Sequence, residues 1–100
     1  MQQSFGEYIR YLRTKNELTL TQLGAKLDLD SANLSKIENG KRDFDEKRLI
    51  LLAQVFDLNL EELKTEFFGD LFAKKLYESS SSTDALIAAE KKVKCLRQIN

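Results

Sequence analysis

Apolar side chains recur every three or four residues along most of this 100-residue chain. That spacing places them on one face of an α-helix, and the strict alternation typical of strands is not found. The pattern predicts helices over residues 5–15, 20–27 and 31–39, a fourth that Asp45 caps, and a fifth that begins at Leu60. With no proline and only four glycines in the sequence, we expect a folded, all-α protein.

Residues suited to a helix N-terminus precede the apolar patterns. Ser4 followed by Glu7, and Thr19 followed by Gln22, have the spacing of a capping box, in which each side chain accepts from the other residue's backbone N–H. Asp30 stands in the same position before the third predicted helix. These residues predict where the first three helices begin.

The chain contains no histidine and a single cysteine, Cys95. The usual general base, the His-containing triads and a Cys/His zinc site are therefore excluded, and we expect no enzyme activity, no cofactor and no metal.

The longest apolar run, residues 49–53, is far shorter than the roughly 20 residues of a membrane span. The chain opens with no secretory pattern, and one cysteine cannot form an internal disulfide. We expect a cytoplasmic protein that does not enter a membrane.

Residues 19–39 have the geometry of a helix-turn-helix: a short helix, a corner at residues 28–30, and a second short helix. Gly24 lies in the middle of the first helix, where glycine costs roughly 1 kcal/mol relative to alanine. A small residue is expected there if the second helix crosses closely over the first; the alternative is that the helix merely tolerates it. Leu34 and Ile37 are the apolar residues of a second helix that is otherwise expected to be exposed.

The segments 18–27 and 34–42 resemble the Cro/cI-type, xenobiotic-response-element-like helix-turn-helix family of bacterial and phage regulators. The string Ser-Lys-Ile-Glu-Asn-Gly-Lys-Arg over residues 35–42 is the most specific part of the resemblance, which extends from about Phe5 to Leu63. It implies a five-helix, lambda-repressor-like DNA-binding domain. Members of the family bind double-stranded DNA operators, usually as dimers on two-fold related half-sites.

The resemblance implies that the helix over about residues 31–39 lies in the major groove. Lys36 is then able to donate to guanine and Ala32 to touch a thymine methyl group. Asn33 either pairs with adenine or serves the helix N-terminus. The residues at or beside the family's base-facing positions are Ser31, Ala32, Asn33, Ser35 and Lys36.

A second set of residues is expected to contact DNA phosphates. Thr19 and Thr21 stand at a helix N-terminus, where backbone amides and the helix dipole favour an anion. Asn39, Lys41 and Arg42 match the family's backbone-gripping loop. The alternative for Lys41 and Arg42 is that they are ordinary solvated turn residues.

Arg13 and Glu38 match a family pair that forms a salt bridge between the first and third helices. A carboxylate near a helix C-terminus is unfavourable with the dipole, so a partner is expected. Two positions depart from the family pattern: Leu20 replaces a phosphate-binding glutamine, and Asp28 replaces a corner glycine. Because the net charge is also zero, we expect the non-specific affinity for DNA, which phosphate contacts supply, to be modest and strongly salt-sensitive.

We expect two parts of the chain: a helix-turn-helix domain over residues 1–66 and a helical extension over residues 67–100. Ser79 to Ser82 form a predicted hinge between the fifth helix and a last helix over about 84–98. The apolar residues of the extension either cap the domain core or form a dimer interface, which we favour. The interface residues expected are Phe67, Phe68, Leu71, Phe72, Leu76, Leu86, Val93 and Leu96.

The sequence thus favours a homodimeric, sequence-specific DNA-binding transcriptional regulator. A protein–protein adaptor that retains the helix-turn-helix fold is the alternative, because the net charge is zero and the helix over residues 31–39 carries small side chains at its start. An antitoxin or a restriction–modification controller is a subtype of the first interpretation.

Overall fold

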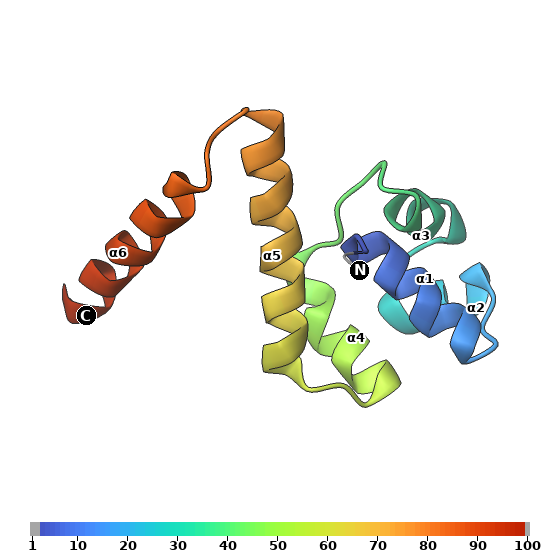
Figure 1. Cartoon of the computed structure of the whole chain (residues 1–100). Helices are drawn as coiled ribbons and strands as arrows, with labels where there is room; N and C mark the ends of the chain where they lie inside the picture. The colour runs from blue at the N-terminus through green and yellow to red at the C-terminus, as the bar shows by residue number, and fades with distance from the viewer. Residues whose placement is uncertain (1–2, 100) are drawn as a thin grey trace. The chain divides into compact units, whose positions relative to one another are not determined.

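The computed structural model describes residues 3–99; residues 1, 2 and 100 of the predicted domains lie outside this range (Figure 1). The described part contains helices and turns only, which confirms the all-α prediction. None of its helices has both the length and the apolarity needed to cross a membrane. The elements are α1 (Phe5–Lys15), α2 (Leu20–Leu27), α3 (Ser31–Glu38), the 3-10 turn η1 (Glu46–Arg48), α4 (Leu49–Phe56), α5 (Leu60–Glu78) and α6 (Asp84–Ile99).

The first three helices begin at their predicted caps. The Ser4 hydroxyl accepts from the Glu7 backbone N–H at 3.1 Å, and the Glu7 carboxylate accepts from Ser4 N at 3.0 Å. These hydrogen bonds lower the pKa of Glu7 below its ordinary value. Thr19 and Gln22 form the same reciprocal pair, at 2.8 and 3.0 Å, and Asp30 caps α3.

The fourth helix differs from the prediction at its start. Asp45 caps the 3-10 turn η1, and α4 begins only at Leu49. The Asp45 carboxylate accepts from the Arg48 backbone N–H at 3.1 Å and also forms an ion pair with the Arg48 guanidinium. This local pair stabilises a tighter turn before the α-helix.

The core lies among α1 to α4 and the first part of α5. The Phe5 ring contacts Phe44 at 5.7 Å and Phe67 edge-to-face at 5.4 Å between ring centroids. Phe67 is only 4% exposed, so the expectation that it lies in a dimer interface is wrong: its ring completes the core. The six largest side chains that are fully buried are Ile9, Leu23, Leu27, Leu34, Leu49 and Leu52.

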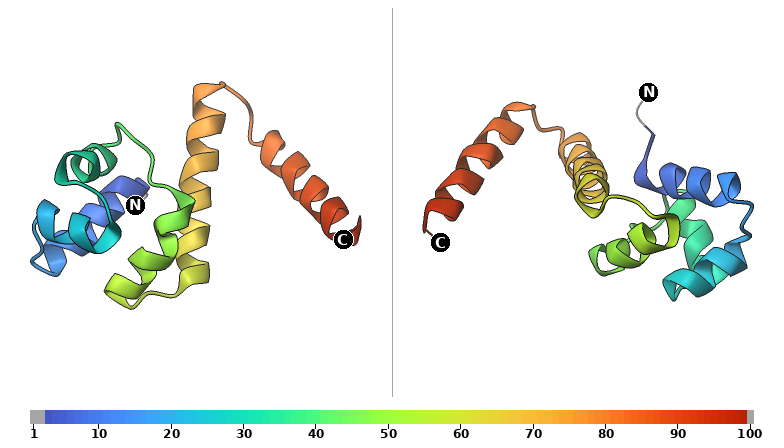
Figure 2. Two further views of the ribbon diagram at one scale, coloured as in Figure 1. Left: turned by 180° about the vertical axis from the view of Figure 1, so that it is seen from behind. Right: turned by 90° about the horizontal axis from the view of Figure 1, so that it is seen from below.

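The chain divides into two compact units, Met1–Asp70 and Leu71–Asn100. The predicted boundary after residue 66 therefore falls inside the first unit. α5 continues without a break through Gly69 to Glu78. In the second unit no residue of α6, which the structure describes in full, is buried. Figure 2 shows α1 to α4 of the first unit from two further directions.

Candidate nucleic-acid interface

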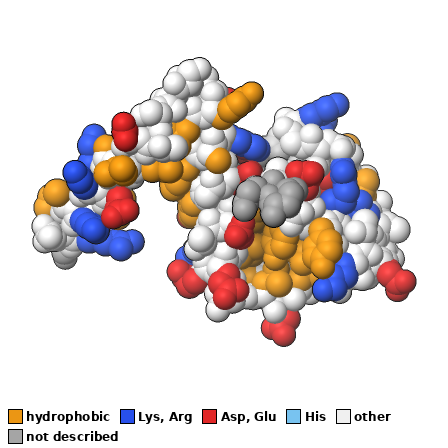
Figure 3. Space-filling model, viewed as in Figure 1, with side chains coloured by type: hydrophobic (Ala, Val, Ile, Leu, Met, Phe, Trp, Pro, Cys, Tyr) orange, Lys and Arg blue, Asp and Glu red, His pale blue; other side chains and the backbone are white. Residues whose placement is uncertain are grey.

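The solvent-facing side of α3 is the candidate site. Leu34 and Ile37 are buried on one side of the helix, and Ser31, Ala32 and Lys36 are exposed on the other. Figure 3 shows Lys and Arg side chains over α3 and the loop that follows it. Residues 3–99 contain no group of three or more His, Cys, Asp or Glu placed to hold a metal ion. The exposed side of α3 is thus a polar face with cationic neighbours.

The corner between α2 and α3 is fixed by backbone contacts. Asp28 adopts the left-handed conformation, with φ of 58°, and the Leu29 N–H donates to the Gly24 carbonyl at 2.8 Å. A Cβ on Gly24 would lie 2.5 Å from the Leu29 carbonyl oxygen. The close approach that requires glycine therefore comes from the corner itself, and not from the body of α3 as the sequence suggested.

Arg48, which sequence reasoning missed, holds the same corner from outside. Its Nε donates to the Leu27 carbonyl at 2.8 Å and its Nη2 to the Asp28 carbonyl at 2.9 Å. These carbonyls belong to the C-terminal end of α2, where helix geometry leaves acceptors without intrahelical partners. The two contacts span 21 and 20 residues, and no local sequence signal points to them.

Helix α1 packs very closely against the C-terminal turn of α3. A Cβ on Gly6 would lie 2.1 Å from the Ile37 carbonyl oxygen and 3.2 Å from that of Glu38. The backbone of α1 thus lies directly against the C-terminal turn of α3, which requires glycine at this position. Sequence reasoning gave Gly6 no role of its own and missed this contact.

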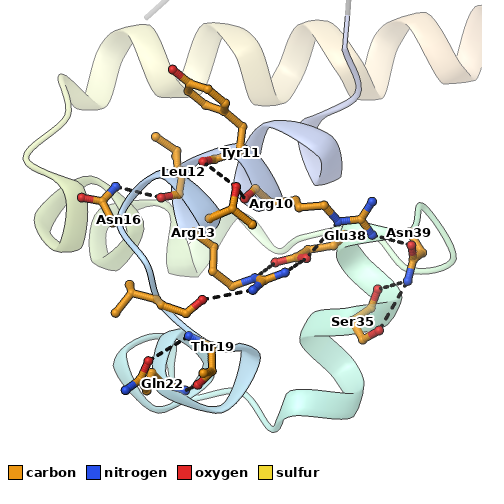
Figure 4. A network of polar contacts seen from close by, with 12 residues as sticks. Arg10, Tyr11, Leu12, Arg13, Asn16, Thr19, Gln22, Ser35, Glu38 and Asn39 are labelled. Atoms are coloured by element: carbon orange, nitrogen blue, oxygen red, sulfur yellow. Dashed lines mark hydrogen bonds and ion pairs between the residues drawn. The ribbon is translucent and has the colours of Figure 1, made fainter.

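The ion pair expected between Arg13 and Glu38 is present in the same region (Figure 4). Arg13 donates through Nε to Glu38 Oε2 at 2.7 Å and through Nη2 to Oε1 at 2.9 Å. The Glu38 side chain is only 2% exposed, and these hydrogen bonds raise the pKa of Arg13. Arg13 Nη1 also donates to the Leu18 carbonyl at 3.1 Å. The pair therefore joins α1, the α1–α2 connection and the end of α3.

Arg10, one turn earlier on α1, extends this network and was not identified from the sequence. Its Nε donates to Glu38 Oε1 at 3.2 Å, and its Nη2 donates to the Asn39 side-chain oxygen. The Asn39 amide in turn donates to the Ser35 carbonyl at 2.9 Å. Asn39 therefore serves as a cap for the end of α3, a role additional to the phosphate contact expected of it.

The other residues of the predicted interface are exposed or serve as helix caps. Thr19, Thr21, Lys41 and Arg42 are exposed, and the Thr19 hydroxyl also accepts the capping hydrogen bond of α2. Asn33 donates from its side chain to the Asp30 carboxylate at 3.1 Å, which is the helix N-terminus role left open by the sequence. The structure brings Ser31, Ala32 and Lys36 to one exposed face and the Lys41–Arg42 loop to its C-terminal end.

The predicted interface residues of the extension differ in exposure. Phe72, Leu86, Val93 and Leu96 are exposed large hydrophobic residues, whereas Phe68, Leu71 and Leu76 are half-buried. In Figure 3 hydrophobic side chains are visible on α6 beside Lys and Arg.

A helix-turn-helix family model matches residues 9–63, which is more than half of the chain. The chain therefore belongs to this helix-turn-helix family, the Cro/cI type expected from its sequence. The matched residues include α2, α3 and the corner between them.

Two curated proteins of Bacillus subtilis (strain 168) are similar to part of the chain. The HTH-type transcriptional repressor RghR is 48% identical over 40 residues, which cover 40% of this chain and 30% of that protein. The uncharacterized HTH-type transcriptional regulator RghRB is 42% identical over 60 residues, which cover 59% of this chain and 43% of that protein. The chain spans less than half the length of these relatives.

A crystal structure of a transcriptional regulator from Listeria innocua has a similar fold. It aligns with 99% of this chain and 97% of its own, with a TM-score of 0.56 and 23% sequence identity. The alignment supports the fold over both units of the chain.

Proposed function

We propose that this chain binds duplex DNA in a sequence-specific manner as a homodimeric transcriptional regulator, with α3 in the major groove. The exposed face of α3 carries the proposal: Ser31, Ala32 and Lys36 are free of the core while Leu34 and Ile37 are buried. A helix of this diameter fits the major groove, where each base pair presents a distinct set of donors and acceptors. The family assignment also supports the expectation that the chain is not an enzyme.

The contacts around α3 support this proposal because they hold the helix in one orientation. Gly6 and Arg13 fix its C-terminal end against α1, and Arg48 fixes the corner before its N-terminus. Lys36 contacts bases in this arrangement, and Lys41 and Arg42 contact phosphates of the flanking strand. Phosphate contacts set the register, and base contacts give the sequence preference.

The homodimer is proposed from the second unit. Leu86, Val93 and Leu96 are exposed on α6 at spacings of seven and three residues, which is the repeat that pairs helices through apolar side chains. A second copy of this chain is the partner, and its two α3 helices read two half-sites of one operator.

Selection of bound duplexes from a random pool tests the proposal. We expect a two-fold symmetric motif with half-site centres separated by about one helical turn, roughly 34 Å. Lys36→Ala should weaken binding to the selected site by about 1–3 kcal/mol and relax the preference at one base pair per half-site.

Lys64→Ala is the control, because Lys64 is a cation of α5 that lies outside the proposed interface. Its base preferences should equal those of the wild type. Failure of the wild-type protein to shift any duplex at low salt would reject the proposal and favour the adaptor alternative. An unchanged motif with Lys36→Ala would reject the placement of α3.

A further inference from the structure

The ion-pair network between α1 and the end of α3, formed by Arg10, Arg13 and Glu38, contains more positive than negative charge. Arg10 and Arg13 both contact Glu38, so two guanidinium groups face one carboxylate. Arg13 makes two hydrogen bonds to Glu38, at 2.7 and 2.9 Å, and its side chain is 15% exposed. A bidentate pair of this kind satisfies the buried carboxylate. Glu38 is therefore satisfied without Arg10, whose charge also acts on Glu7, one turn earlier on α1.

The Arg10 charge lies at the surface. The Arg10 side chain is 44% exposed, about three times as much as that of Arg13. Its guanidinium is held at two points, through Nε to Glu38 and through Nη2 to Asn39. A guanidinium has five N–H donors, so the two bonds orient the group and leave donors for an external acceptor. Less conformational entropy is lost when such a pre-oriented side chain binds.

Arg10 also lies next to the loop for which phosphate contacts are proposed. Asn39, which accepts its hydrogen bond, precedes Gly40 and the exposed residues Lys41 and Arg42. Figure 4 shows the Arg10 guanidinium beside Asn39 at the C-terminal end of α3. Arginine binds phosphate through a planar pair of donors, a geometry that lysine lacks. A DNA strand gripped by this loop passes within reach of Arg10.

The geometry points to Arg10 as a DNA-phosphate contact that is pre-oriented by Glu38 and Asn39. This contact would extend the phosphate-binding surface of Lys41 and Arg42 to α1. This inference rests on the proposed DNA-binding function and extends its interface to a helix outside the helix-turn-helix. Arg10 makes no base contact in this arrangement, so it adds affinity without sequence preference.

The salt dependence of binding to the selected duplex tests the inference. Arg10→Gln should lower the magnitude of the slope of log K against log salt by about 0.9 per protomer and weaken binding about tenfold at low salt, with an unchanged motif. Arg10→Lys keeps the charge but loses the planar pair of donors, and should retain the wild-type slope with weaker binding. Lys64→Gln is the matched control, because Lys64 is 42% exposed and ion-paired with Glu61; its slope should stay that of the wild type.

A wild-type slope with Arg10→Gln in a variant that circular dichroism shows to be folded would overturn the inference while the proposed function stands. Protection of arginine from phenylglyoxal, read by mass spectrometry of the wild-type complex, gives the answer without a variant. Saturating duplex should protect Arg10 together with Arg42. Protection of Arg42 alone overturns the inference only, and protection of neither contradicts the proposed function as well.

Discussion

Gly6 lies where two helices meet backbone to backbone. The Cβ that any other residue would add meets the Ile37 carbonyl oxygen at 2.1 Å, and a carbonyl within a helix cannot move away without loss of hydrogen bonds. A substitution at this position must therefore displace α1 or α3 as a whole.

We predict that Gly6→Ala lowers the free energy of unfolding by about 1–3 kcal/mol, the usual range for overpacking. Urea denaturation followed by circular dichroism measures the change. Gly69→Ala is the control: no described atom lies within 4 Å of its added Cβ, so the better helix propensity of alanine should raise stability by about 0.5–1 kcal/mol. A Gly6→Ala variant as stable as the wild type would contradict the contact.

The residues that sequence reasoning identified differ in kind from those it missed. Ser4 and Thr19 were recognised because a capping box lies within four consecutive residues. Arg13 and Glu38 were paired only through the family resemblance. Arg10 and Arg48 bond to groups 20 or more residues away, and no local pattern reveals a contact of that range.

At the scale of elements, the four connections that follow α1 to α4 each contain one residue with positive φ: Glu17, Asp28, Gly40 and Asp57. Asp28 directly follows α2 and Asp57 directly follows α4, both in the left-handed conformation with φ of 58° and 53°. In each case the following leucine N–H donates back to a carbonyl of the helix: Leu29 to Gly24 and Leu58 to Ala53, both at 2.8 Å. This is a helix C-terminus of the kind that glycine usually provides.

Replacing Asp28 by glycine should therefore stabilise the protein. The left-handed conformation is strained for a residue with a Cβ, and the Asp28 carbonyl that accepts from Arg48 remains in the variant. We expect Asp28→Gly to raise the free energy of unfolding by about 0.5–1 kcal/mol, measured as a higher urea midpoint. Asp28→Val, with a branched Cβ in the same conformation, should lower it. Equal stability of the two variants would contradict this account of the corner.

The bounds of elements were predictable wherever a side chain terminates the helix. α1 and α2 have the predicted ends because their caps are local. The 3-10 turn before α4 was not foreseen, since it depends on how Arg48 bonds to both Asp45 and α2. The core position of Phe67 also followed only from the structure, because its partner Phe5 lies at the other end of the domain sequence.

At the scale of the whole molecule, α6 presents apolar side chains that its own unit leaves exposed. Leu86, Val93 and Leu96 are between 43% and 59% exposed. Exposed apolar residues in a row mark an interaction surface more often than isolated ones do. The proposed homodimer would bury them against a second copy.

We predict that Val93→Glu separates the dimer, because a carboxylate placed between apolar surfaces loses hydration without gaining a partner. Sedimentation equilibrium should show a fall from a dimer mass toward the 11.5 kDa of the single chain. Gln98→Glu is the control, because residue 98 is two positions beyond Leu96 and outside the apolar repeat. A wild-type protein that is monomeric at tens of micromolar would contradict the dimer proposal.

The residues that bury α3 differ from those on its exposed side, and this separation affects how the sequences of related chains diverge. Leu34, Ile37 and Glu38 supply the buried contacts of the helix, and none of them belongs to its exposed side. In the proposed complex, exchanges at positions 31, 32 and 36 would therefore alter which duplex is preferred with little effect on folding. Descendants of one ancestral chain can thereby acquire separate target sites through a few surface substitutions, with no compensating change elsewhere.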